Sequence, residues 1–186
     1  MTSDRHLVLI ALFAALIAAL GLVPAFQVPF LGGVPITAQT LGVMLAGVIL
    51  GPVRGALAVL LLLFGVALGL PLLAGGRGGL GVFQSPSVGF LIGWPIAAFV
   101  TGLIMQKMAD ANVLVSSIVA AAFGGIIVLY AFGVPGLAIM LKTPLWETFI
   151  GAMIYVPGDM IKVVLTGLIT QTIARGYPSA LLTRRS

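Results

Sequence analysis

Hydrophobic residues fill most of the chain in long runs that few charged positions interrupt. Such runs predict membrane-spanning helices, because about 20 apolar residues cross the hydrocarbon core of a bilayer. The second run is short for a full crossing, so we expect residues 39–50 to be kinked, tilted or partly re-entrant. Along the sequence, hydropathy predicts six spans, at residues 7–24, 38–50, 53–73, 88–106, 113–132 and 146–174.

Composition agrees with a chain that lies in the bilayer. Hydrophobic residues make up 61% and charged residues only 7% of the sequence, against roughly 25% charged residues in soluble domains. With 186 residues the chain has no room for a separate soluble domain beside six spans. We therefore expect an all-α integral membrane protein with one transmembrane domain, residues 1–186.

Charge placement predicts the orientation of the spans, because Lys and Arg near span ends favour the cytoplasmic side. With the amino terminus inside, Arg77 and Lys142 lie on the outer side, and six basic residues lie on the inner side: Arg5, Arg54, Lys107, Arg175, Arg184 and Arg185. This asymmetry predicts that both termini are cytoplasmic. It also explains the net charge of +5 without nucleic acid as a partner.

The outer loops expected at residues 25–37, 74–87 and 133–145 are rich in Gly and Pro and almost free of charge. We interpret them as lids over a pocket. For residues 133–136 the alternative that they are simple turns is equally open.

Asp159 and Lys162 interrupt the last apolar run. At a spacing of three they share one helix face, and an ionised group at the bilayer centre costs about 2.5–3.5 kcal/mol on insertion scales. The pair is either an ion pair that fixes helix packing or part of a polar ligand site inside a helical bundle. Pro157 removes a backbone hydrogen bond just before the pair, so we expect a bend there. Tyr155 lies nearer the outer end of the same run, consistent with a site that opens outward.

Further candidate ligand-binding residues lie where the outer loops meet the spans. Gln39 places an amide at the start of the second span. In the glycine-rich loop, the backbone at Gly78 and Gly79 can approach a ligand closely. This loop is not a phosphate loop, since it lacks the GxxxxGK[ST] pattern. The weaker candidates there are Arg77 and Gln84 for polar contacts and Phe90 for an apolar wall.

The first span carries two stripes of small residues, Ala11/Ala15/Ala19 and Ala14/Ala18. A spacing of four places each stripe on one helix face, where another helix can approach closely. One stripe can pack inside the fold while the other is free for a partner.

Several classes of function lack their chemistry in this sequence. There is no cysteine, and the one histidine is His6, so a nucleophile with its base and the usual metal ligands are absent. We expect no enzyme activity, no metal and no cofactor. The two-halves repeat of many secondary carriers is not visible either, and no nucleotide-binding motif is present.

Four motifs in order along the chain resemble the BioY biotin transporter family: PITAQTLG (35–42), LGPVRGA (50–56), the glycine-rich loop leading into SVGFLIG (87–93), and PGDMIK (157–162). The resemblance covers almost the whole chain. One departure is Phe90, where the family commonly has a tyrosine, so a hydroxyl is missing at that position.

The resemblance implies a substrate-binding (S) component of an energy-coupling factor (ECF) transporter in the cytoplasmic membrane of a prokaryote. It implies a six-helix fold that captures biotin from outside, with the family's binding Asp and Lys at Asp159 and Lys162. It also implies two kinds of partner, a transmembrane coupling protein that docks on the alanine-striped first helix and a pair of ATPases. In that scheme the whole S component rotates in the membrane to deliver the vitamin. An S component for another vitamin and a stand-alone ion-coupled carrier are the alternatives.

Overall fold

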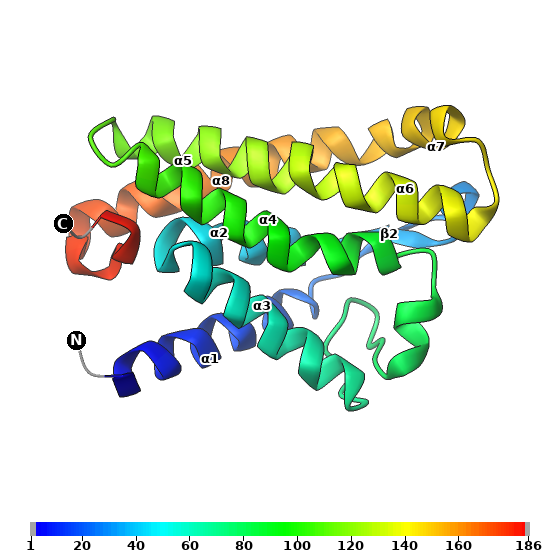
Figure 1. Ribbon diagram of the computed structural model, residues 1–186, viewed down its shortest axis with the longest axis horizontal. Coiled ribbons are helices and arrows are strands. Elements are labelled where there is room, and N and C mark those ends of the chain that lie inside the picture. Colours follow the sequence, from blue (N-terminus) through cyan, green and yellow to red (C-terminus); the bar gives the residue numbers. More distant parts are fainter. Residues whose placement is uncertain (1–2, 185–186) are drawn as a thin grey trace.

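The computed structural model describes residues 3–184, so Arg185 lies outside the described residues. The described chain is a helical bundle (Figure 1) whose helices are α1 (Ser3–Leu20), α2 (Gln39–Leu50), α3 (Pro52–Ala67), α4 (Val88–Lys107), α5 (Val113–Ala122), α6 (Leu129–Leu141), α7 (Leu145–Ala152) and α8 (Val156–Gly176). A π-helical segment, η3 (Phe123–Val128), joins α5 to α6, and a 3-10 turn, η4 (Met153–Tyr155), joins α7 to α8. Within residues 3–184, three stretches are helical, long and apolar enough to cross a membrane: 88–107, 113–141 and 145–176.

Helix α2 lies at the centre of the bundle and packs against α1, α3, α4 and α8. Its 12 residues extend about 18 Å, too short to cross the hydrocarbon core alone. Residues 42–50 are buried, and Gly47 packs directly on the backbone of α4 at Ala98 and Gly102. The uniformly apolar sequence of the second run thus reflects burial on all sides by other helices.

The prediction of an outer loop at 133–145 is wrong for most of this segment. Helix α6 continues to Leu141, with Pro135 inside it. Gly136 packs on Gly89 of α4, and Gly133 packs on Phe90, so these glycines allow close helix packing instead of making turns. Pro135 is tolerated because neighbouring helices compensate for a lost backbone bond in membrane helices.

The third span also ends earlier than its hydropathy suggests. Helix α3 ends at Ala67, and Gly69 follows with a φ of 100°. This is left-handed backbone that glycine adopts without strain. Residues 68–73 therefore connect α3 to the glycine-rich loop, although their sequence is as apolar as that of a membrane-spanning helix.

Near Pro157, where we expect a bend, the last apolar run is interrupted between two helices. The 3-10 turn η4 ends at Tyr155, and α8 begins at Val156 with Pro157 in its first turn. A proline in the first turn has no intrahelical partner to lose. The short α7 is thereby set apart from the long α8 that carries Asp159 and Lys162.

The segment expected as an outer loop at 25–37 contains a small hairpin. Strand β1 (Phe26–Val28) pairs antiparallel with β2 (Val34–Ile36), with the 3-10 turn η1 (Pro29–Leu31) between them. Figure 1 shows this hairpin and α7 at one end of the bundle and both chain ends at the other. The 3-10 turn η2 (Leu80–Gln84) follows the glycine-rich residues, and two more, η5 (Pro178–Ala180) and η6 (Leu182–Arg184), end the described chain.

Candidate functional site

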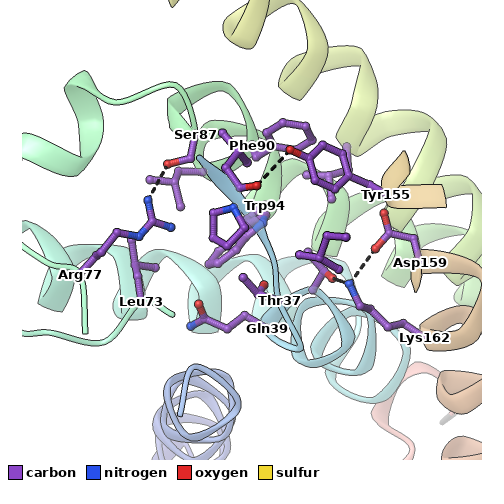
Figure 2. A pocket seen from close by; sticks show the side chains of 16 residues that line it. Thr37, Gln39, Leu73, Arg77, Ser87, Phe90, Trp94, Tyr155, Asp159 and Lys162 are labelled. Atoms are coloured by element: carbon purple, nitrogen blue, oxygen red, sulfur yellow. Dashed lines mark hydrogen bonds and ion pairs between the residues drawn. The ribbon is translucent and has the colours of Figure 1, made fainter. Parts of the chain in front are cut away.

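A partly enclosed cavity of about 570 Å³, open space at its mouth included, lies where α2, α4 and α8 meet the hairpin and the glycine-rich loop (Figure 2). Its walls are mainly apolar, with a few polar groups. The lining residues are Val34, Pro35, Ile36, Thr37, Gln39, Thr40, Leu73, Arg77, Ser87, Phe90, Leu91, Trp94, Leu129, Tyr155, Asp159 and Lys162.

Asp159 and Lys162 form an ion pair on one side of this cavity. The Lys162 ammonium donates to Asp159 Oδ1 at 2.8 Å and to Thr40 Oγ1 on α2 at 2.9 Å. The Tyr130 hydroxyl donates to the other carboxylate oxygen, Oδ2, at 2.7 Å. Asp159 is only 5% exposed, and both charged residues border the cavity. The sequence left two alternatives for this pair, an ion pair that fixes helix packing and part of a ligand site. The structure shows a feature of each, a direct bond between the two side chains and open space beside them.

Arg77 and Ser87 lie on the opposite side of the cavity from this pair (Figure 2). The guanidinium donates from Nε to the Ala74 carbonyl at 3.2 Å and from Nη1 to Ser87 Oγ at 3.3 Å. Burial lowers the pKa of Arg77 from its ordinary value, but a guanidinium stays protonated in proteins. Within the described residues no carboxylate forms a salt bridge with it. Its positive charge is available to a ligand.

Aromatic side chains build the wall between these two polar ends. The Phe90 ring meets the rings of Tyr155 and Tyr130 edge to face, with centroids 6.0 and 6.1 Å apart, a favoured geometry. The Tyr155 hydroxyl donates to the Val34 carbonyl of the hairpin at 3.1 Å. Tyr155 thus ties the hairpin to the helix break at η4, and Trp94 adds a second apolar surface.

Gln39 borders the cavity, but its amide already has three partners. Nε2 donates to the Ile17 and Leu72 carbonyls at 3.1 and 3.0 Å, and Oε1 accepts from the Ala74 N–H at 2.9 Å. One acceptor site is left for a ligand. In this structure the residue mainly connects α1, α2 and the start of the glycine-rich loop.

The structure does not bring Gly78, Gly79 or Gln84 to the cavity lining. Gly78 packs on the Leu70 backbone, where a Cβ would collide. The Gly79 N–H already donates to the Val66 carbonyl at 2.7 Å, and Gln84 is exposed. The glycines thus serve the folding of the loop itself. Of the predicted candidates, Gln39, Arg77, Phe90, Tyr155, Asp159 and Lys162 do share the cavity.

Sequence reasoning missed Tyr130 entirely and did not assign a role to Thr40. Tyr130 sits near the end of the fifth predicted span and looks like an interfacial aromatic. No local pattern reveals that the π-helical segment before it changes which side chains face inward. Thr40 lies in the motif at 35–42, and a hydroxyl at the start of an apolar span was the available signal.

The two alanine stripes of α1 face opposite ways. Ala14 is buried and Ala18 is partly buried, whereas Ala11, Ala15 and Ala19 are exposed. Leu7, Val8, Leu12 and Leu16 are exposed beside them. The exposed stripe therefore lies on an apolar face that points away from the rest of the described bundle.

Comparison with known proteins agrees with these features. The BioY family model matches residues 1–179. The "Biotin transporter BioY" of Rhodobacter capsulatus is 52% identical, covering 97% of this chain and 99% of that protein. The protein of the same name from Rhizobium etli is 51% identical over 95% and 96% of the two chains.

A crystal structure of the S-component for biotin from an ECF-type ABC transporter superposes with a TM-score of 0.88 at 30% identity. The match covers 97% of this chain and 99% of the other, and it confirms the expected S-component fold, which is predominantly helical. Family model, relatives and fold agree over nearly the full length, and the chain belongs to the BioY family.

Proposed function

We propose that this chain binds biotin in the cavity between Asp159 and Arg77 and is the substrate-binding subunit of an ECF-type transporter. The observation that carries the proposal is a buried acid paired with a partly buried base, both bordering an open cavity in a membrane protein. An ion pair that only fixed helix packing would need no open space beside it. The names of the relatives and the fold neighbour point to the same ligand.

The polar groups of biotin match the two ends of the cavity. Its ureido ring offers two N–H donors and a carbonyl acceptor, complementary to a carboxylate and an ammonium. Asp159 accepts from a ureido N–H, and Lys162 donates to the ureido carbonyl. The ring system packs against Phe90, Trp94 and Tyr155, and the valerate carboxylate points to Arg77. Charge-assisted hydrogen bonds at both ends favour this ligand over an apolar one.

Energy for uptake comes from partner subunits. The relatives are transporters, as the sequence led us to expect for a chain without catalytic groups. In an ECF transporter the S component works with a transmembrane coupling protein and ATPases. The exposed stripe Ala11/Ala15/Ala19 is the docking surface on α1 for the coupling protein, because small side chains allow close helix approach.

We further propose six crossings of the cytoplasmic membrane, with both termini inside and the cavity open to the outside. The two chain ends lie together at the end of the bundle opposite the hairpin (Figure 1), as an even number of crossings requires. Lys107 ends α4 at the proposed inner side, while Arg77 and Lys142 lie in the outer connections.

Equilibrium binding of radiolabelled biotin to the purified chain in detergent tests the proposal. We expect saturable submicromolar binding that unlabelled biotin displaces and thiamine or riboflavin does not. Binding of another vitamin in place of biotin would assign a different S component. Biotin uptake by vesicles containing this chain alone, driven by an ion gradient, would instead favour a stand-alone carrier.

A further inference from the structure

We infer that Tyr130 is a positioning residue for the carboxylate of Asp159, and that its ring separates this carboxylate from the surrounding lipid. The inference rests on the proposed function, since it concerns the same site. Tyr130 does not line the cavity. It acts on the ligand only through Asp159.

The first support is the hydrogen bond itself. The Tyr130 hydroxyl donates to Asp159 Oδ2 at 2.7 Å, while Lys162 holds Oδ1 at 2.8 Å. The two donors come from different helices and fix the plane of the carboxylate. A carboxylate has about four acceptor sites, so each oxygen keeps capacity for an N–H of the ligand.

The second support is the way in which Tyr130 is held. It is 7% exposed, and its ring meets Phe90 edge to face. It follows the π-helical segment η3, where Gly125 packs on Met44 of α2. An extra residue in a π turn rotates the helix that follows. Leu129 thereby reaches the cavity while the hydroxyl of its neighbour Tyr130 reaches Asp159.

The third support is a second hollow behind Tyr130. An apolar groove lies between α6 and the α7–η4 segment, and its lining includes Tyr130, Val134, Trp146, Phe149 and Met153. Trp146 is 68% exposed and Phe149 is 41% exposed, so the groove opens to the outside of the bundle. In the membrane it faces hydrocarbon, which stabilises no charge. The Tyr130 ring stands between this groove and the Asp159 carboxylate.

Loss of the hydroxyl and loss of the ring should therefore have different effects. Tyr130→Phe keeps the ring and removes the donor, so we expect biotin affinity to fall about tenfold or more, as for a hydrogen bond to a charged group. Tyr130→Ala also opens the wall to the groove and should weaken binding further. Each variant should lose the same factor in affinity for biotin as for biotin methyl ester, because the valerate end is remote from Tyr130.

A double-mutant cycle with Asp159→Asn separates positioning from general packing. If Tyr130 acts through the carboxylate, Tyr130→Phe should change the residual affinity of Asp159→Asn by less than about twofold, since contacting residues are non-additive. Equal losses in both backgrounds would overturn the inference. Thr170→Val is the matched control, because Thr170 on α8 is buried and its hydroxyl donates within its own helix, to the Thr166 carbonyl. It should leave affinity unchanged.

The outcomes for the two proposals are distinguishable. Absence of biotin binding by the wild-type protein contradicts the proposed function, whereas wild-type affinity in Tyr130→Phe contradicts only the role of Tyr130. If Tyr130→Phe does not fold, Tyr130→Met fills the space without a donor and carries the same expectation. If neither variant folds, Tyr130 is a residue required for folding and the inference fails.

Discussion

Gln39 and Ala74, one at the start of α2 and the other in the glycine-rich loop, are joined by a hydrogen bond of 2.9 Å from the Ala74 N–H to Gln39 Oε1. The same amide group donates to the Ile17 and Leu72 carbonyls. A residue that borders the cavity thus also satisfies three backbone groups, two of them in fully buried hydrogen bonds. Gln39 can therefore affect both ligand binding and the stability of the fold.

Gln39→Leu should therefore lower stability. It leaves the Ala74 N–H and two carbonyls unpaired, and each unsatisfied buried group costs about 1–3 kcal/mol. Thermal unfolding in detergent measures the effect. The control is Gln84→Leu at an exposed position, for which we expect no change. An unchanged melting temperature in Gln39→Leu would show that the amide is not needed for the fold.

Substitutions at Asp159 and Lys162 should separate stability from binding. Removing one partner of a buried pair costs about 3–5 kcal/mol, because the other charge is left alone. Asp159→Asn and Lys162→Met should each destabilise the protein and weaken biotin binding strongly. The double variant should regain much of the stability and none of the affinity. Recovery of affinity in the double variant would argue that the pair only supports packing.

Arg77→Gln should weaken binding of biotin by about tenfold or more and leave binding of biotin methyl ester unchanged. The guanidinium remains charged although burial lowers the pKa of Arg77. The contribution of Arg77 should thus disappear only as the pH falls through the pKa of the ligand carboxyl, where the carboxylate charge is lost. Competition titrations with both ligands between acidic and neutral pH measure this. Equal losses for acid and ester would place the valerate elsewhere.

The two stripes of α1 should respond differently to larger side chains. Ala15→Leu, on the exposed stripe, should leave biotin binding by the isolated chain unchanged but reduce co-purification with the coupling protein. Ala14→Leu, at a buried position, should overpack the bundle and cost about 1–3 kcal/mol. Pull-down of the complex and thermal unfolding measure the two effects. Normal assembly in Ala15→Leu would move the docking surface to another face.

Hydropathy was sufficient to predict the helical fold and the positions of most helices, because burial in lipid and burial in protein both select apolar residues. For the same reason it misplaced the ends of α3 and α6: residues 68–73 and 133–141 are equally apolar, yet one is a loop and the other a helix. Local backbone preferences at Gly69 and packing at Gly136 decide between them, and packing depends on the partner helix.

The candidate site was predictable where a residue was costly in its setting. Asp159 and Lys162 stand out because a charge in the membrane needs compensation. Tyr130 did not stand out, because its role depends on how η3 rotates α6. Gly78 and Gly79 were predicted as ligand contacts because a glycine backbone can be approached closely, but in the structure the backbone of the loop's own neighbouring residues makes that approach.

The most direct test of the account is a structure of the purified chain with biotin bound. We expect the ureido ring beside Asp159 and Lys162, within hydrogen-bonding distance of both, and the valerate directed to Arg77. Biotin bound outside this cavity, or bound inside it with no contact to either charged group, would contradict the account.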